Sequence, residues 1–295
     1  MNALANVLVI ARLTLLEALR RRILRALIVL TVVIVVLTGL GFGALVDNAR
    51  HGTRPSPEVE ILAATSQLLI LVSFMFSFVL VMTAAFLGSP AISADLESGV
   101  LLAIAARPIR RAEILVGKWL GLGGIVGGYA VVAGLLEIYV VNLTTGYMPP
   151  GPVIATLYLA AQAIVLLSVS VLLSTRLPPI AGGAVAVVLF GLSWIAGILV
   201  NVAGFLGLDA LGKSLEAARY LLPLDGLWRG TEFALEPQAI LLLVQAGGES
   251  RAARIVANSP FYAATGPPPE FVLYVVLWTA VVLGLAIVSF RRREI

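Results

Sequence analysis

The sequence predicts an all-α, polytopic membrane protein with six transmembrane helices. Of its 295 residues, 60% are hydrophobic and only 12% are charged, whereas soluble domains carry about 25% charged residues. Six segments are close to the length of about 20 apolar residues that a spanning helix requires. The basic residues are also sorted between the connections, which is typical of a protein with a fixed orientation in a membrane.

The predicted spans follow one another along the whole chain. They cover residues 24–46, 61–87, 119–143, 153–173, 180–200 and 271–290. The first apolar run is longer than the 7–15 residues typical of a signal peptide, so we expect it to be retained as a span.

Most basic residues lie on one side of this arrangement. Thirteen of the 20 Lys and Arg residues are found there, namely Arg12, Arg20, Arg21, Arg22, Arg25, Arg107, Arg110, Arg111, Lys118, Arg176, Arg291, Arg292 and Arg293. The positive-inside rule therefore places both termini in the cytoplasm and the chain in the plasma (inner) membrane, and an even number of spans agrees with this.

Residues 1–22 precede the first span and have helical periodicity. One helical face carries Leu4, Leu8, Ala11, Leu15 and Ala18. We expect this segment to lie flat in the cytoplasmic interface with that face toward the lipid. The alternative is a simple extension of the first span.

Residues 201–270 are too many for a turn. The stretch 210–222 has the pattern of an amphipathic helix stopped by Pro223, and 239–244 is apolar but too short to span. We predict a small helical extracytoplasmic segment that lies as a cap on the outer membrane surface. A loose loop is the alternative.

The third span is rich in glycine. Gly123 with Gly127, and Gly124 with Gly128, form two overlapping GxxxG pairs. Because such pairs let helix backbones approach closely, we expect this span to pack tightly against another helix.

The composition also excludes several kinds of chemistry. The chain has no Cys and one His, His51, which leaves no thiolate site and little room for a metal site. No predicted span contains Asp or His, so we expect no enzymatic activity, no metal and no cofactor bound by this chain. The basic residues flank apolar runs, which indicates membrane orientation rather than nucleic-acid binding.

Polar residues inside the spans are candidates for a substrate path. Glu137 is the only acidic residue within a predicted span, and an ionisable group there is a functional candidate by default. Gln67 and Gln162 are weaker candidates of the same kind. The alternative is a hydrogen bond to a neighbouring helix.

Residues 207–214 formally match the phosphate-binding pattern G-x4-G-K-[ST]. That pattern requires a strand before it and a helix after it, but here a predicted span precedes it. We interpret this stretch as a turn rather than a nucleotide site.

The connection between spans 2 and 3, residues 88–118, is the most informative. Asp95 and Glu97 fall in a predicted helix that follows Pro90, and Gly99 breaks that helix. A new helix is expected from Pro108 onward. The pattern predicts a helix–break–helix on the cytoplasmic face; the alternative is a solvated loop.

This connection resembles the signature of the ABC-2 family of exporter permeases. The matching residues are Glu97, Gly99, Val100, Leu101, Leu102, Pro108, Ile109, Arg110, Arg111, Glu113, Gly117 and Lys118. Val100 replaces the usual Thr, Ala105 and Ala106 replace a usual Ser, and Arg110 replaces a Ser. Residues 11–22 and 220–228 resemble the NosY-like branch, which is linked with maturation of multicopper enzymes.

The resemblance implies that residues 1–295 form a single ABC-2 transmembrane domain, the permease subunit of an exporter. It implies that the connection is a coupling helix seated in a separate cytoplasmic ATPase subunit, which binds ATP and Mg²⁺. The implied coupling residues are Asp95, Glu97, Gly99, Leu101, Leu102, Pro108, Arg111, Glu113 and Lys118.

The same resemblance implies a second permease copy or a homologous permease as partner, alongside membrane lipids and, in some relatives, an extracytoplasmic accessory protein. It does not identify the substrate. A secondary transporter or channel that works without ATP is the alternative function, although such proteins usually show several ionisable groups in their spans or internal repeats.

Overall fold

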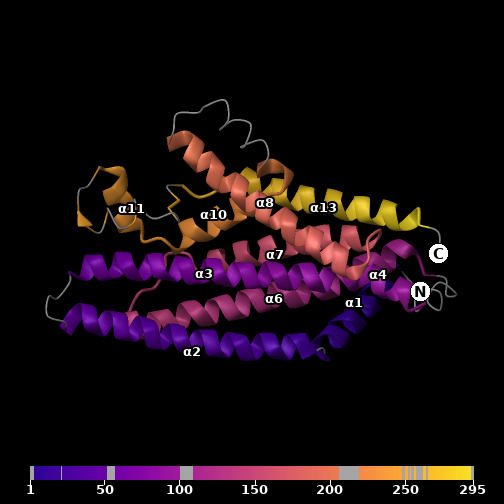
Figure 1. Ribbon diagram of the computed structural model, residues 1–295, viewed down its shortest axis with the longest axis horizontal. Helices are drawn as coiled ribbons and strands as arrows, with labels where there is room; N and C mark the ends of the chain where they lie inside the picture. Colours follow the sequence, from indigo (N-terminus) through magenta and orange to yellow (C-terminus); the bar gives the residue numbers. More distant parts are fainter. Residues whose placement is uncertain are drawn as a thin grey trace.

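The computed structural model is an elongated bundle of helices (Figure 1). It describes residues 3–20, 22–51, 57–99, 109–205, 219–247, 250–251, 253, 256, 262–263 and 265–293. Every regular element among these residues is a helix. The all-α prediction is therefore confirmed.

Within the part of the chain that the structure describes, six helices are long and apolar enough to cross a membrane. They are α2 (Arg22–His51), α3 (Glu58–Gly88), α6 (Arg111–Thr145), α7 (Pro152–Ser174), α8 (Pro179–Phe205) and α13 (Pro269–Arg291). Each contains one predicted span, so the prediction of six spans is confirmed. The helices extend past the predicted edges because helical backbone continues beyond the apolar runs. At 1.5 Å per residue, α6 is about 50 Å long and exceeds the roughly 30 Å hydrocarbon core.

The centre of the bundle is α7. Of its most apolar stretch 67% is buried, compared with 22% in α2 and 17% in α13. Leu166 and Leu167 are fully buried within the two largest clusters of apolar side chains. The outer helices expose apolar side chains over much of their surface, as expected where lipid rather than protein covers them.

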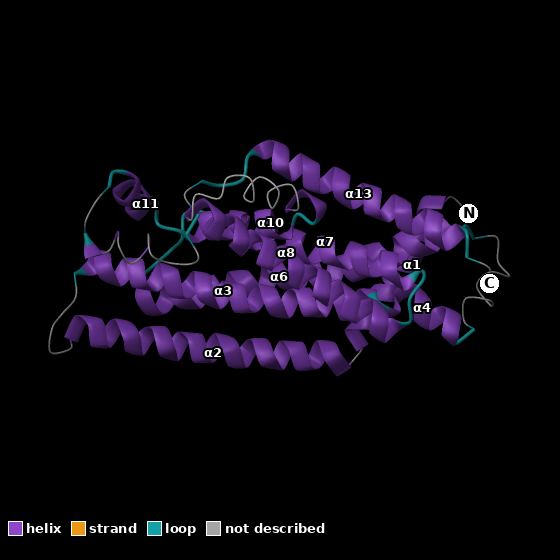
Figure 2. Ribbon diagram, turned by 45° about the horizontal axis from the view of Figure 1, so that its top comes forward, coloured by secondary structure: helices purple, strands orange, loops and turns teal. Residues whose placement is uncertain are grey.

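Both chain termini lie at the same end of the bundle (Figure 1, Figure 2). The short helices α1 (Ala3–Arg20) and α4 (Pro90–Glu97) are found at this end. The end of α2, the start of α3 and the short helix α11 (Gln238–Gln245) lie at the opposite end. The apolar stretch 239–244 is therefore helical, as predicted, and too short to span.

The predicted apolar face of α1 is divided, because its later residues pack on the protein and its first residues are exposed. Asn6 and Ala18 are buried, whereas Leu4 and Leu8 are 70% and 57% exposed. Their side chains are thus available to lipid while the Asn6 side packs on α6. The interfacial position of α1 in the membrane stays a prediction.

The helix α10 (Leu224–Leu235) differs from the predicted surface cap. It runs antiparallel beside α7, with contacts that pair Ala234 with Gly151, Thr231 with Ala155, and Leu224 with Gln162. Gln162 lies ten residues, about 15 Å, inside the start of α7. This helix therefore inserts among the spans instead of lying on top of them. Most of the predicted helix 210–222 falls outside the described residues, although residues 219–221 are helical.

Candidate coupling site

The helix α4 is a direct continuation of the span α3. Pro90 occupies the first turn of α4, where its missing backbone N–H leaves no partner unsatisfied. Ser89 keeps helical backbone angles, and its N–H donates to the Ala85 carbonyl at 3.0 Å. A single residue, Ser89, therefore separates the two helices.

The predicted break after α4 is present in the structure. Ser98 Oγ donates to the Ala94 carbonyl at 2.8 Å, and Gly99 adopts φ +72°. Glycine enters this left-handed region at little cost, and the conformation ends the helix. Residues 100–108, which include Leu101, Leu102 and Pro108, lie outside the described part of the chain.

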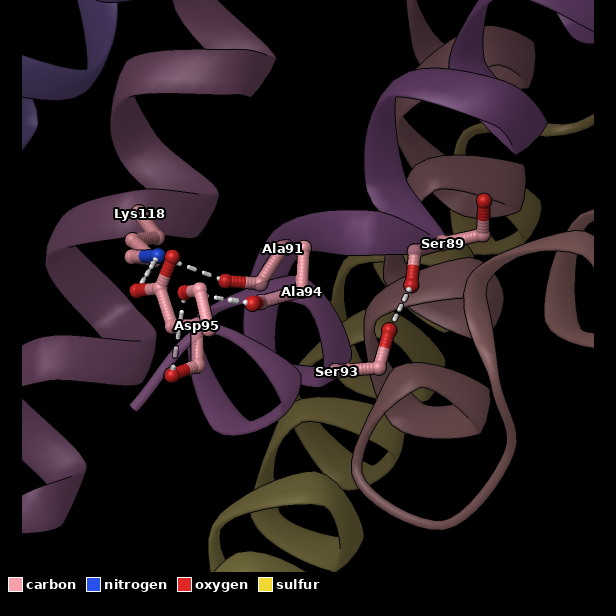
Figure 3. A network of polar contacts seen from close by, with 7 residues as sticks. Ser89, Ala91, Ser93, Ala94, Asp95 and Lys118 are labelled. Carbon is pink, nitrogen blue, oxygen red and sulfur yellow. Dashed lines mark hydrogen bonds and ion pairs between the residues drawn. The ribbon is translucent and has the colours of Figure 1, made fainter. Parts of the chain in front are cut away.

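A lysine on α6 fastens α4 to the bundle (Figure 3). Lys118 Nζ donates to the Ala91 carbonyl at 2.7 Å and forms an ion pair with Asp95. The two charged side chains are only 15% and 23% exposed, so solvent screens this pair less than a surface pair. We call these contacts the Lys118 brace. Asp95 and Lys118 were both predicted as coupling residues, and the structure brings them together.

A second predicted residue of α6 holds α1. Glu113 is 8% exposed, and its Oε2 accepts a hydrogen bond from Asn6 Nδ2 at 2.8 Å. A buried carboxylate requires such a donor to offset the loss of hydration. Glu113 therefore has a partner within the chain, and it joins the N-terminal helix to the start of α6.

Glycines let α1 and α6 approach closely beside this hydrogen bond. A Cβ atom at Gly117 would lie 2.7 Å from Ile10 Cβ, and one at Gly121 would lie 2.6 Å from the Ala11 carbonyl oxygen. Close helix packing by α6 is thus confirmed, but its tightest contacts with α1 use this pair, about two turns earlier than the predicted pairs. A Cβ at Gly128 would meet no atom within 4 Å.

Arg111 ties the start of α6 to the C-terminal end of the chain. Its Nη1 donates to the carbonyls of Phe290, Arg291 and Arg293 at 3.1, 3.2 and 2.7 Å. Its guanidinium also lies 5.8 Å from the centre of the Phe290 ring. The last carbonyls of a helix lack partners within that helix, and a cation satisfies them well. Arg293 in turn donates to the Thr175 carbonyl at 2.5 Å.

Glu97 differs from the other charged residues of this region. It lies at the end of α4 and is exposed, whereas Asp95, Arg111, Glu113 and Lys118 all contact the chain itself. We call α4 and residues 111–118 the coupling corner. The geometry makes it a rigid corner joined to α1, α3, α6 and α13, with Glu97 at its outer edge.

The three candidate substrate-path residues do not converge on one site. Gln162 Nε2 donates to the Leu224 carbonyl at 3.3 Å, and Gln67 Nε2 donates to Glu236 Oε1 at 3.4 Å. Gln162 thus contacts the first residue of α10, and Gln67 contacts Glu236, which directly follows the last residue of α10. Glu137 instead hydrogen-bonds to Thr38 of α2.

The sequence did not predict a buried ion cluster at the start of α10. Asp225 is 9% exposed and pairs with Arg219 at 2.9 Å and with Arg229 at 3.3 Å. Burial raises the pKa of the Asp225 carboxyl above its ordinary value, and the two guanidinium groups counteract this shift. Arg219 also donates to the Gly197 carbonyl at 3.0 Å, which links the cluster to α8.

Two more acidic residues on this segment are buried. Glu232 is 5% exposed and Glu236 is fully buried. Burial raises the pKa of each carboxyl to about 8, while hydrogen bonds from Trp228 to Glu232 and from Gln67 to Glu236 act in the opposite direction. Both groups are therefore largely protonated at neutral pH, which removes most of the penalty of burying them.

The phosphate-binding pattern at residues 207–214 lies outside the described residues. Its interpretation as a turn stays a prediction.

Comparison with known protein families gives a match over nearly the whole chain. The family model of the ABC-2 family transporter proteins matches residues 8–295, which include all six spans and the coupling corner. Among curated proteins, none matches the sequence. The chain therefore belongs to the ABC-2 family of transporter proteins, whose members are permease subunits of ABC transporters.

Proposed function

We propose that this permease subunit belongs to an ATP-driven exporter and that its coupling corner receives the movement of a separate ATPase subunit. The single observation that carries the proposal is the Lys118 brace. Without the brace, the short helix α4 could move relative to α6, and a push on α4 would not reach the rest of the bundle. The brace and the direct junction of α3 and α4 at Ser89 instead make α4 a lever.

The contacts of the corner define what such a lever would move. Lys118 passes a displacement of α4 to α6, and Glu113 passes it from α6 to α1 through Asn6. Arg111 passes it to the end of α13. Four helices would tilt together as one body, which is a common form of switching transition in proteins.

The charge distribution supports a cytoplasmic position for this end in a plasma membrane. Arg111, Arg176 and Arg293 gather here, since Arg176 donates to Ser289 Oγ at 3.0 Å near the contacts of the other two. By the positive-inside rule the termini and the coupling corner then face the cytosol, where ATP and Mg²⁺ are available to the ATPase. The chain itself would bind no cofactor.

One chain of six spans encloses little space, so we infer a second permease copy or a homologous permease across the path. The NosY-like resemblance favours a role in the maturation of metalloenzymes, with an extracytoplasmic accessory protein as a further partner. The substrate is best identified by asking which molecules stimulate ATP hydrolysis by the copurified complex.

A charge reversal at Glu97 tests the docking of the ATPase. We expect Glu97→Lys to reduce the amount of ATPase that copurifies with the tagged chain by roughly tenfold or more, because opposed like charges at an interface cost several kcal/mol. The matched control is Glu270→Lys, which reverses an exposed glutamate at the other end of the bundle. The control is expected to copurify the ATPase at the wild-type level.

Two outcomes would contradict this proposal. One is an equal yield of ATPase with wild-type and Glu97→Lys chains. The other is transport by the purified chain that follows a proton or sodium gradient with no ATPase present, which would favour a secondary transporter.

Disruption of the brace separates force transmission from docking. We expect Lys118→Met to keep the ATPase bound while substrate transport falls roughly tenfold or more, because α4 can then move without α6. Residues that act as one unit have non-additive effects. The double variant Asp95→Asn/Lys118→Met should therefore transport no worse than Lys118→Met alone. Additive losses would show that the two residues act separately.

A further inference from the structure

The junction between α10 and α11 lies at the end of the bundle opposite the coupling corner (Figure 1, Figure 2). Glu236 and Pro237 are the two residues between these helices. Just beyond them, Ile240 of α11 packs with Ala63 of α3 and with Val256, and all three side chains are fully buried. The helix α11 is therefore held at the start of α3 by a small apolar contact.

A contact between a carboxyl and an amide lies next to this apolar contact. Gln67 Nε2 donates to Glu236 Oε1 at 3.4 Å, and the backbone of Ala263 also hydrogen-bonds to the Glu236 carboxyl. Gln67 and Ala63 are four residues apart, so they share one face of α3. The two contacts together determine whether α11 stays on α3.

Two oxygen atoms of the carboxyl–amide contact are buried without a hydrogen-bond partner, namely Glu236 Oε2 and Gln67 Oε1. An ionised carboxylate and an amide oxygen both only accept hydrogen bonds, so neither can satisfy the other. A proton on Glu236 Oε2 changes this, because a protonated carboxyl has one O–H donor. Since the unpartnered amide oxygen belongs to the side chain that already donates to this carboxyl, one proton would complete two reciprocal hydrogen bonds.

The surroundings of Glu236 favour its protonated form. Among the residues that the structure describes, no Lys or Arg forms an ion pair with Glu236, whereas Arg229 pairs with Asp225 and Arg251 pairs with Glu60. Burial raises the pKa of the Glu236 carboxyl to about 8. The proton is therefore bound at neutral pH and lost in mildly alkaline solution.

Other titratable groups surround this carboxyl. Those whose pKa is raised by the charge of Glu236 are Glu232 on α10, Tyr147 just after α6, and Tyr262. On α3, Glu60 lies two turns before Gln67 and is paired with Arg251 at 3.3 Å. Glu232 is the group that must be tested separately, because its pKa is also about 8.

We propose that Glu236 and Gln67 form a proton-dependent latch that holds α11 against α3. With the proton in place, Glu236 Oε2 donates to Gln67 Oε1 and the latch is closed. Loss of the proton leaves a buried carboxylate opposite an unsatisfied amide oxygen, and α11 separates from α3 so that water reaches the charge. Protons thus control the opening of this end of the bundle. The proposal depends neither on an ATPase nor on the orientation of the chain in the membrane.

Labelling of single introduced cysteines tests the latch, because the chain contains no Cys. Ala63→Cys places a thiol in the buried contact with α11, and Leu242→Cys places one at a position of α11 that is 66% exposed. The chain is labelled in lipid nanodiscs with a membrane-impermeant maleimide. We expect the labelling rate of Ala63→Cys, divided by that of Leu242→Cys, to rise roughly tenfold or more from pH 6 to pH 9. The division corrects for the greater reactivity of a thiolate at high pH.

Three variants of the Ala63→Cys chain assign this rise to the latch. Glu236→Gln keeps a donor and an acceptor but cannot ionise, so the ratio should stay at its low pH 6 value up to pH 9. Glu232→Gln is the matched control and should keep the rise. Gln67→Leu leaves the buried carboxyl without the amide, so the ratio should already be raised roughly tenfold at pH 6.

A second buried cysteine keeps the test independent of the Ala63 substitution. Ile240→Cys lies on the α11 side of the same contact and should respond to pH as Ala63→Cys does. The latch is overturned if neither buried cysteine shows a higher ratio at pH 9 than at pH 6. It is also overturned if Glu236→Gln shows the same rise as the chain with Glu236, or if Gln67→Leu leaves the ratio at pH 6 unchanged.

Discussion

The chain carrying Asp225→Ala is expected to lose about 3–5 kcal/mol of unfolding free energy, the range observed when one partner of a buried ion pair is removed. The substitution leaves Arg219 and Arg229 without their shared carboxylate, and these side chains are only 17% and 33% exposed. The partial exposure of Arg229 shifts the expected loss toward the lower end. Thermal or denaturant unfolding of the purified chain in detergent measures it.

Two further variants separate the charge from the shape of this residue. Asp225→Asn preserves the size of the side chain and should lose nearly as much stability as Asp225→Ala, because the amide cannot neutralise the guanidinium groups. Glu58→Ala removes a carboxylate from an exposed ion pair with Arg50 and should change stability by less than about 1 kcal/mol. If the free energy of unfolding of Asp225→Ala lies within about 1 kcal/mol of the wild-type value, the ion cluster does not hold α10 in place.

The spans were predictable because their signal is local and strong. A run of about 20 apolar residues has few stable environments other than lipid, and each predicted run falls within one helix of the structure. The break at Gly99 was predictable for the same reason, since a glycine after a short helix specifies its own backbone conformation. The sequence also predicts which end of the bundle carries most of the basic residues, because their positions between the spans determine it.

The inserted position of α10 could not be read from the sequence. Asp225, Arg229, Glu232 and Glu236 are spaced so that they share one helical face. Such a charged stripe normally faces water, so nothing in it indicates a position among the spans. Here it is buried because an arginine pair neutralises Asp225, and because burial keeps the two glutamates protonated.

Close packing around α10 likewise depends on residues far away in the chain. A side chain at Gly197 would collide with the Asp225 carboxylate, and one at Gly230 would lie 2.7 Å from the Tyr158 ring. The Lys118 brace also depends on a contact between distant residues, because Lys118 and Asp95 are 23 positions apart. The resemblance to the ABC-2 permeases selected both of its charged residues, but only the structure shows that they contact each other.

The buried glutamates also predict an unusual dependence of stability on pH. The pKa of the Glu236 carboxyl is raised to about 8 by burial in the folded chain, compared with an ordinary value of 4.5. Between these two values the folded chain holds a proton that the unfolded chain releases. The contribution of Glu236 to the free energy of unfolding should therefore be fully present below about pH 4.5 and be lost as the pH rises through 8.

We expect Glu236→Gln to remove this part of the pH dependence. The amide keeps the shape of the protonated acid and cannot ionise, so the variant should be more stable than the wild type at pH 8, by at most on the order of 5 kcal/mol, and should differ little from it near pH 4.5. Glu232 has a similarly raised pKa, so roughly half of the slope between pH 5 and 8 should remain. Unfolding of the chain in detergent at several pH values measures this slope, and Glu270→Gln, at an exposed position, should leave it unchanged.

A slope that is equal in the wild type and in Glu236→Gln would mean that Glu236 is already ionised at neutral pH. That result would also require a further partner for this buried carboxylate, beyond the long hydrogen bond from Gln67 and the one from the Ala263 backbone.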